Sequence, residues 1–321
     1  MSTIYRRRTV FLSILIAIYV VAFSLTFRDS YLSYANISAI LINMSIELLV
    51  IIGMALLLIS GEFDLSLGAT MSLSGILCGY LIKIGVGVAL SISITFAVCV
   101  LFGVLNGVIV AKIGVNSFIT TLATGIIIRG IAVRIAGPGI LKLPERFIVL
   151  GQKVLGGLQL PVWYAVVTAA VFIYLVSMTR VFRQYYFIGG NPKAAVLSGI
   201  NMARMKIIAF AIAACLSGFA GIVSAARFGN AMTAVGNGIE MRAITASVIG
   251  GISIKGGVGS IGGAILGALF IALLNNGVII AEIDPYWQPI VLGIVLVIAV
   301  IIDVVMSRNR ARAKQPTAGI S

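Results

Sequence analysis

One carboxylate lies deep inside an apolar stretch of the chain. Glu47 falls in the run 38–60, where most other side chains are hydrophobic. A charge at membrane depth is costly and tends to serve a function, so Glu47 is expected to face the interior of a helix bundle or a wet path. There it could accept hydrogen bonds from the hydroxyls of a substrate, or it could pair with Arg129 or Arg134.

The stretch Ser60–Gly68 interrupts the apolar sequence with two more carboxylates, Glu62 and Asp64. An aspartate before Leu65-Ser66-Leu67 suits the start of a helix, because its oxygen can accept hydrogen bonds from free backbone amides. The stretch is therefore either a cytoplasmic turn, with Gly61 in the turn and Asp64 as its cap, or an irregular segment that lines a cavity.

Amide side chains inside apolar stretches form a second group of polar candidates. They can hydrogen-bond a polyol, but they also hold helices together in lipid. Together with Glu47, three of them are candidates for a substrate path: Asn106, Asn275 and Asn276. Because the chain has no histidine and no credible pair of nucleophile and base, neither an intramembrane enzyme nor a metal site is expected.

A glycine-rich stretch, Gly250–Gly263, contains one lysine, Lys255. It is not a phosphate-binding loop, because the spacing G-x-x-x-x-G-K-[ST] is absent. With no other nucleotide signature in the sequence, the chain is not expected to hydrolyse ATP. Glycines allow sharp turns and close backbone approach, which predicts a cytoplasmic hairpin and a packing seam. Its turn residues are Gly250, Gly251, Gly256 and Gly257.

The longest polar stretch between apolar runs, Arg183–Lys206, is basic and carries the signals of a short helix. Asn191 suits the N-cap, Pro192 suits the first helical position, and Gly199 suits the residue after the last turn. A small rigid helix at a membrane surface is suited to the attachment of a partner protein that moves the rest of the chain.

The composition places these residues in a helical membrane protein. Of 321 residues, 60% are hydrophobic and 10% are charged, whereas a soluble domain has about 45–50% and about 25%. The apolar runs do not alternate with polar residues as the strands of a membrane barrel do. The net charge of +14 comes from Lys and Arg in short loops and tails, which indicates membrane topology rather than binding of nucleic acid.

The apolar runs predict an all-α fold with about ten membrane crossings, some of them short or broken. The crossings are 10–27, 38–60, 67–84, 88–111, 117–136, 161–179, 206–226, 242–254, 259–281 and 287–306. Basic residues gather on one side, which is then the cytoplasm, and both termini lie there. One domain, 1–321, is expected, with a cytoplasmic loop at about 180–206 and a flexible cytoplasmic tail at about 307–321.

Two internal echoes suggest an inverted repeat, although chance similarity between glycine-rich helices is an alternative. Asn106-Gly-Val-Ile-Val-Ala-Lys-Ile resembles Asn276-Gly-Val-Ile-Ile-Ala-Glu-Ile, and the first copy ends in the cytoplasm while the second ends outside. The second echo pairs Ser60–Gly68 with Gly250–Val258. Both of its copies lie toward the cytoplasm, so the two echoes disagree by about one span.

Several stretches, in this order along the chain, are together typical of one family. They are Gly61–Gly68, Gly103–Gly107, Phe118–Ala123, Gly189–Ile200, Ser217–Gly221, Ile249–Gly257, Leu274–Gly277 and Asp303. The chain resembles the permease subunit of a bacterial ATP-binding-cassette (ABC) importer of the ribose, xylose or simple-sugar type. It departs from the family's usual small residues at Glu62, Thr245 and Ser247, which bears on the substrate rather than on the fold.

The resemblance implies a set of partners. Two permease chains, identical or different, would form the path through the bacterial inner membrane, and a periplasmic binding protein would deliver a sugar. A cytoplasmic ATPase subunit would use ATP and Mg²⁺, with no cofactor bound by this chain. The ATPase would dock on Gly189–Ile200, with Gly189, Gly190, Asn191, Pro192, Ala194, Ala195, Ser198 and Gly199 as coupling residues.

Two other functions stay open. An ion-coupled secondary transporter would need membrane carboxylates to carry the ion, and Glu47 is the only firm candidate. The other is an importer permease for a nucleoside or a branched-chain amino acid. An amino-acid path should offer groups for both charged ends of its cargo, and the sequence shows no clear pair, so a neutral sugar leads.

Overall fold

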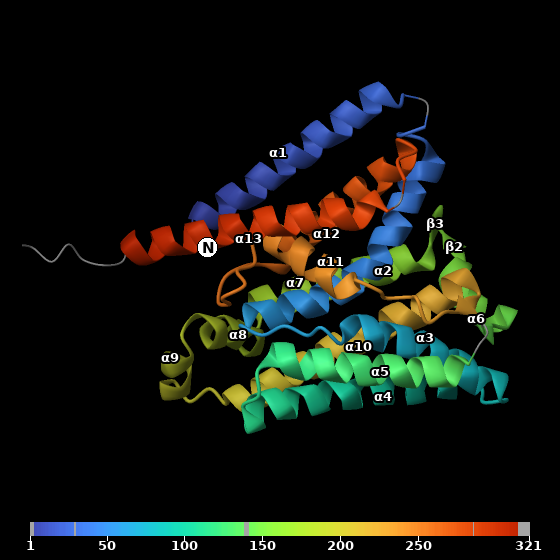
Figure 1. Ribbon diagram of the computed structural model, residues 1–321, viewed down its shortest axis with the longest axis horizontal. Helices are drawn as coiled ribbons and strands as arrows, with labels where there is room; N and C mark the ends of the chain where they lie inside the picture. Colours follow the sequence, from blue (N-terminus) through green and yellow to red (C-terminus); the bar gives the residue numbers. More distant parts are fainter. Residues whose placement is uncertain (1–2, 29, 138–140, 285, 314–321) are drawn as a thin grey trace, which may run out of the picture.

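The computed structural model describes residues 3–28, 30–137, 141–284 and 286–313 (Figure 1). Within these residues the chain is built almost entirely from helices, so the predicted all-α class is confirmed. The elements are α1 (Thr3–Thr26), α2 (Tyr34–Ile59), α3 (Leu67–Lys83), α4 (Val88–Val108), the π-helical turn η1 (Ile109–Ile113), α5 (Ser117–Ala136), β1 (Leu141–Lys142), α6 (Glu145–Gln152), β2 (Val154–Leu155), β3 (Leu158–Gln159), α7 (Leu160–Met178), α8 (Arg180–Gly190), α9 (Pro192–Leu197), α10 (Met202–Phe228), β4 (Asn230–Ala231), α11 (Ile239–Ile249), α12 (Ile261–Ile280) and α13 (Trp287–Ala313).

Eight of the described helices are long and apolar enough to cross a membrane: α1, α2, α4, α5, α7, α10, α12 and α13. The other two predicted crossings contain shorter helices. Helix α3 has 17 residues and α11 has 11, which gives lengths of about 26 Å and about 17 Å against a hydrocarbon core of about 30 Å. The chain is therefore a polytopic helical membrane protein with two short helices among its long ones.

The predicted crossing 242–254 is wrong at its C-terminal end. Helix α11 stops at Ile249, and Gly250 and Gly251 follow it. Gly251 has φ of +94°, a left-handed conformation that glycine adopts without a steric penalty and that ends a helix. The short length of α11 is thus set by backbone geometry rather than by a loss of apolar character.

Helix α2 is the centre of the bundle. Its side chains from Leu48 to Ile59 are all buried, which suits a helix that is hydrophobic on every side. Helices α7, α10, α11 and α12 all pack against it. Helix α10, the second buried helix, also packs along α3 and α4. Figure 1 shows α1 and α13 on one edge of this arrangement and α4 and α5 on the other.

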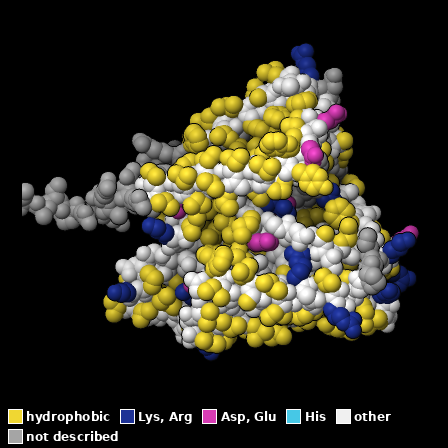
Figure 2. Space-filling model, in the orientation of Figure 1, with side chains coloured by type: hydrophobic (Ala, Val, Ile, Leu, Met, Phe, Trp, Pro, Cys, Tyr) yellow, Lys and Arg dark blue, Asp and Glu magenta, His cyan; other side chains and the backbone are white. Residues whose placement is uncertain are grey.

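Helices α1 and α13 are at the periphery and present apolar side chains outward, including Ile18, Ile294 and Ile298. Figure 2 shows hydrophobic side chains over most of this face, with few charged groups among them. In a soluble protein such a surface would promote aggregation. In a membrane protein it is the surface that contacts lipid.

Helices α8 and α9 lie at one end of the long helices, at the left in Figure 1, with the start of α1 and the end of α13 on the same side. At the opposite end lie α6 and two short antiparallel strand pairs. Strand β1 pairs with β4, which is distant in the chain, and β2 pairs with β3 in a hairpin. The Trp163 indole donates a hydrogen bond to the Leu155 carbonyl at 3.0 Å, which ties this hairpin to the start of α7.

The predicted cytoplasmic tail, at about 307–321, begins within the last helix. Helix α13 continues to Ala313, so residues 307–313 extend the last helix beyond its apolar part. Residues 314–321 lie outside the described residues. The sequence over 307–313, Ser-Arg-Asn-Arg-Ala-Arg-Ala, has no proline or glycine to end the helix, and arginine and alanine are good helix formers.

The first pair of similar segments occupies matching positions in the order of the helices, and the second pair does not. Asn106 lies in α4 and Asn276 lies in α12. The offset that brings Asn106 onto Asn276 brings the connection 60–66, between α2 and α3, onto 230–236, between α10 and α11. Gly250–Val258 instead connects α11 to α12, so its likeness to Ser60–Gly68 has no counterpart in the helix order.

Glycines let α4 approach α10 closely. A Cβ at Gly103 would lie 2.6 Å from the Phe210 carbonyl oxygen and 2.9 Å from Ala211 Cα. We expect Gly103→Ala to lower the free energy of unfolding by about 1–3 kcal/mol, because the added methyl must push two backbones apart. The midpoint of thermal unfolding of the purified protein in detergent measures this.

Gly130→Ala is the matched control, because Gly130 is also in a helix but a Cβ there meets no atom within 4 Å. It should leave stability unchanged or raise it slightly, since alanine is the better helix former. Equal midpoints for the Gly103 variant and the wild type would show that α4 and α10 are not packed this closely.

Candidate functional site

Helix α9 begins and ends at the residues that the sequence predicted. The Asn191 side-chain oxygen accepts a hydrogen bond from the Ala194 amide at 3.1 Å, and Pro192 is the first helical residue. Gly199 follows the C-cap with φ of +77°. The local sequence thus closes both ends of a six-residue helix that is too short to be stable from its internal hydrogen bonds alone.

Helix α9 exposes two large apolar side chains, which the sequence analysis missed. Leu197 is 89% exposed and Val196 is 58% exposed. Ala195 is buried and holds the helix against the body of the protein. Large apolar side chains on a short helix outside the bundle are seldom left exposed to water, so they are suited to contact with a protein partner.

A second helix in this segment, α8, was also missed, because the segment was read as a polar loop with one helix. The Thr179 hydroxyl caps it by accepting from the Phe182 amide. Tyr185 and Ile188 are buried on one face, and the Tyr185 hydroxyl donates to the Met205 carbonyl at 3.2 Å. Burial raises the pKa of Tyr185 above its ordinary value. Apolar residues three apart in a polar segment were the available signal.

Five glycines join α8 to both halves of the chain. We call Gly61, Gly189, Gly190, Gly256 and Gly257 the glycine junction. A Cβ at Gly256 would lie 2.8 Å from Gly61 Cα and 2.9 Å from Gly189 Cα, and a Cβ at Gly257 would overlap Gly190. The backbones are therefore in direct contact, with no side chain between them.

Hydrogen bonds complete the junction. The Gly257 amide donates to the Ile59 carbonyl at 2.8 Å, which links the α11–α12 connection to the end of α2. The Tyr186 hydroxyl of α8 donates to the Gly259 carbonyl at 3.0 Å. Three of the predicted turn glycines, Gly61, Gly256 and Gly257, thus lie at one place with two of the predicted coupling residues, Gly189 and Gly190, whereas Gly250 packs against Gly263.

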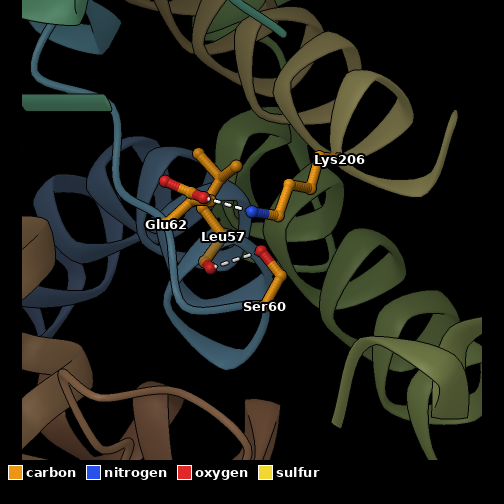
Figure 3. Close-up of polar contacts among 4 residues, drawn as sticks. All are labelled: Leu57, Ser60, Glu62 and Lys206. Atoms are coloured by element: carbon orange, nitrogen blue, oxygen red, sulfur yellow. Dashed lines mark hydrogen bonds and ion pairs between the residues drawn. The ribbon is translucent and has the colours of Figure 1, made fainter. Parts of the chain in front are cut away.

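An ion pair holds the turn after α2 onto α10. Lys206 Nζ lies 2.6 Å from Glu62 Oε1, and their side chains are 20% and 13% exposed. Figure 3 shows Lys206 reaching from α10 toward Glu62, while the Ser60 hydroxyl donates to the Leu57 carbonyl beside it at 2.7 Å. The departure from the family's usual residue at Glu62 is therefore matched by a lysine next to the coupling segment.

Asp64 stabilises the connection before α3 rather than capping the helix itself. Its Oδ1 accepts a hydrogen bond from the Ser66 amide at 2.7 Å and another from the Ser66 hydroxyl. The Asn106 amide donates to the Ser66 hydroxyl at 3.0 Å. Asn106 therefore belongs to this buried network, and the structure does not bring it to the other three candidate path residues.

Those three residues do lie together. Glu47, Asn275 and Asn276 line a cavity of about 50 Å³ between α2 and α12, together with Ile40, Asn43, Met44, Ala272 and Ile279. The ion partner of Glu47 is Arg242 of α11, with 2.9 Å between Glu47 Oε1 and Arg242 Nε. The pairing with Arg129 or Arg134 is wrong: Arg129 donates to the Thr233 and Val235 carbonyls.

Three polar contacts on α2 were not foreseen from the sequence. Arg227 Nη1 donates to the Asn43 side-chain oxygen at 2.8 Å, and Asn36 exchanges hydrogen bonds with Asn276 at 2.6 and 3.3 Å. The partners come from three different helices far along the chain. No spacing in the sequence connects Asn43 with Arg227 or Glu47 with Arg242, so only the packing of helices could reveal these pairs.

Comparison with known proteins identifies the family to which the chain belongs. A family model described as the permease component of a branched-chain amino acid transport system matches residues 36–300. The chain belongs to this family of ABC importer permeases. The resemblance on which the sequence analysis relied is thereby confirmed. No solved structure gives a significant match.

Several relatives of this permease are named as sugar permeases. The ribose import permease protein RbsC of Haemophilus influenzae is 33% identical over 91% of each chain. The L-arabinose transport system permease protein AraH of Escherichia coli is 33% identical over 90% of this chain and 87% of its own. The galactose/methyl galactoside import permease protein MglC of Salmonella typhimurium is 32% identical over 86% and 89%.

The glycine junction of the permease predicts different outcomes at two adjacent residues. A Cβ at Gly189 would overlap the Ile59 carbonyl oxygen, whereas one at Gly190 would meet its nearest atom at an ordinary 3.6 Å. Gly189→Ala should therefore detach α8 and expose the segment 180–206 to trypsin, and Gly190→Ala should not. Equal digestion of the two variants, followed by mass spectrometry of the fragments, would contradict the junction.

The Glu62–Lys206 pair predicts a charge effect on stability. Lys206→Met leaves the mostly buried Glu62 carboxylate without its partner, which should cost about 1–3 kcal/mol. Adding Glu62→Gln should restore part of the loss. Lys112→Met, on an exposed residue at the same end of the bundle, is the control and should have no effect. Thermal unfolding in detergent tests all three, and a double variant no better than the single one would contradict a direct pair.

Proposed function

We propose that the chain is the membrane subunit of an ATP-driven importer that carries a monosaccharide across the bacterial inner membrane into the cytoplasm. The observation that carries this proposal is α9, a capped helix outside the bundle that exposes Leu197 and Val196. It follows directly after α8, whose last two residues belong to the glycine junction. The names of the sugar permeases among its relatives supply the cargo class. Hydrolysis of ATP belongs to a separate subunit that α9 would contact.

The proposed topology has ten crossings in an inverted repeat, with α8, α9 and both chain ends in the cytoplasm. Helices α2–α5 form one half and α10–α13 the other. Helix α4 ends near α5 on the α9 side, whereas α12 begins on that side, so the two echo helices run in opposite directions (Figure 1). Helices α3 and α11, the two short ones, then occupy equivalent positions, as discontinuous helices do in other transporters.

In the proposed coupling mechanism, rigid contact between backbones passes the movement of α9 to the helix bundle. Movement of α9 by an ATPase subunit would be passed to α8 and then to the glycine junction. There it reaches the end of α2 in one half and the α11–α12 connection in the other. Backbone contact transmits such a displacement with little loss, because no flexible side chain lies between the segments. In a dimer of permeases, two such movements would alternate access to the path.

A branched-chain amino acid is the second candidate cargo, and one observation favours it. The Glu47–Arg242 pair places both charges inside the membrane, where an amino acid would need them. However, the two groups lie 2.9 Å apart and neutralise each other. A zwitterion would have to separate them, whereas a neutral polyol can hydrogen-bond to both, so the sugar is favoured.

Leu197→Asp tests the docking role of α9. The change places a charge on a fully exposed side chain, so folding and membrane insertion should be unaffected. If Leu197 fits a groove of the ATPase subunit, sugar uptake by cells with the whole importer should fall about tenfold or more, as at other interface anchors.

Ile113→Asp is the matched control, because Ile113 is also apolar, 69% exposed and on the α9 side, but it is not part of α9. Uptake of D-ribose, L-arabinose, D-galactose and L-leucine should be measured in each strain. Normal uptake in the Leu197 variant would refute the docking site, and uptake of leucine alone by the wild type would refute the sugar.

A further inference from the structure

We propose that the Glu47–Arg242 pair, with Asn43 and Asn275, is a polyol-binding subsite inside the membrane, and that the permease itself discriminates among sugars there. This inference rests on the proposed function, since it concerns the path of the same cargo. It goes further by assigning substrate selection to the permease and by naming Arg242 and Asn43, which neither the sequence pattern nor the family resemblance indicated.

The subsite lies on one polar stripe of α2. Asn36, Asn43 and Glu47 are seven and then four residues apart, a spacing that puts all three on the same helix face at 3.6 residues per turn. From Leu48 onward α2 is apolar and buried. The polar stripe therefore runs from the N-terminal end of α2, opposite α9, to the middle of the helix, where Glu47 ends it.

The stripe is accessible from outside the bundle along part of its length. Asn43 is exposed, and the side chains of Glu47 and Arg242 are 24% and 27% exposed although both lie within the bundle. An amide and an ion pair facing lipid would be costly, so this exposure indicates a wet path. The adjacent cavity of about 50 Å³ can hold a water molecule, which occupies about 30 Å³ in the liquid.

The groups on this path match the chemistry of a polyol. Each sugar hydroxyl can both donate and accept a hydrogen bond. The Glu47 carboxylate only accepts, the Arg242 guanidinium only donates, and the amides of Asn43 and Asn275 do both. The paired charges cancel, so a neutral sugar can bind without separating ions. The cavity is too small for a sugar ring, so α2 and α12 must move apart to admit one.

Selectivity at the permease is measured at sugar concentrations that saturate the binding protein. The uptake rate then no longer depends on the affinity of the binding protein for each sugar. The whole importer in proteoliposomes is supplied with D-ribose, L-arabinose, D-galactose or their deoxy analogues, and maximal uptake rates are compared. In Glu47→Gln and Arg242→Lys, the ratio of rates between sugars should change about tenfold or more, because sites that hydrogen-bond a hydroxyl discriminate strongly against analogues that lack it.

Glu62→Gln is the matched control, since it disrupts the other described ion pair, near the coupling segment. It should lower the rates for all sugars in parallel and leave their ratios unchanged. Parallel loss in the Glu47 and Arg242 variants, or full recovery of wild-type ratios in the swap Glu47→Arg with Arg242→Glu, would show a purely structural pair and overturn the subsite. Absence of sugar uptake by the wild-type importer would instead refute the proposed function.

A second measurement does not depend on transport rates. Asn43→Cys in the intact importer should react with a membrane-impermeant thiol reagent added from the side opposite α9, and saturating sugar-loaded binding protein should slow the reaction. Ile37→Cys, which is exposed on α2 but off the polar stripe, should not react. Failure of the Asn43→Cys variant to react, or labelling that sugar leaves unchanged, would overturn the wet path.

Discussion

Direct contact between backbones at the glycine junction determines how the rest of the protein is arranged. Gly189 and Gly190 end α8, Gly61 follows α2, and Gly256 and Gly257 lie between α11 and α12. A Cβ at Gly189, Gly256 or Gly257 would overlap the backbone of a neighbouring segment, so glycine at these three positions sets the distance between the segments. Segments from the first half, the middle and the second half of the chain meet there. As a result α9, which makes few contacts of its own, is rigidly attached to a bundle built from both halves of the chain.

Several charged side chains inside the bundle have a charged or polar partner. Glu47 is next to Arg242, Glu62 is next to Lys206, and the Arg227 guanidinium binds the Asn43 amide oxygen. Taking a charge out of water is expensive unless a partner and hydrogen bonds offset the cost. The pair near the α9 end holds a turn onto α10 and is mostly buried, whereas the pair in the middle of α2 is more exposed and borders a cavity. The two ion pairs thus lie in different environments. The Glu62–Lys206 pair is suited to holding segments together, and the Glu47–Arg242 pair is suited to contact with a hydrated solute.

The two short helices give the bundle its polar interior. A full-length helix satisfies its own backbone hydrogen bonds across the membrane, but α3 and α11 leave the connections 60–66 and 229–238 irregular within or beside the bundle. Irregular backbone is tolerated there only where protein or water satisfies it. Asp64, Ser66 and Asn106 serve the first connection, and Arg129, bound to the Thr233 and Val235 carbonyls, serves the second. These contacts explain why polar side chains interrupt otherwise apolar spans.

The sequence alone determined the membrane class, the positions of nearly all long helices, and the caps of α9, because each depends on local composition or on hydrogen bonds within a few residues. Asn191, Pro192 and Gly199 are an example, since their conformational preferences act over a single turn. Tertiary structure decided what lies between segments distant in the chain. The ion partner of Glu47, the separation of Asn106 from Asn275 and Asn276, and the meeting of five glycines all depend on how helices pack. Helix α8 and the early end of α11 were missed although local signals existed: apolar residues three apart in α8, and the glycine pair Gly250-Gly251 after α11.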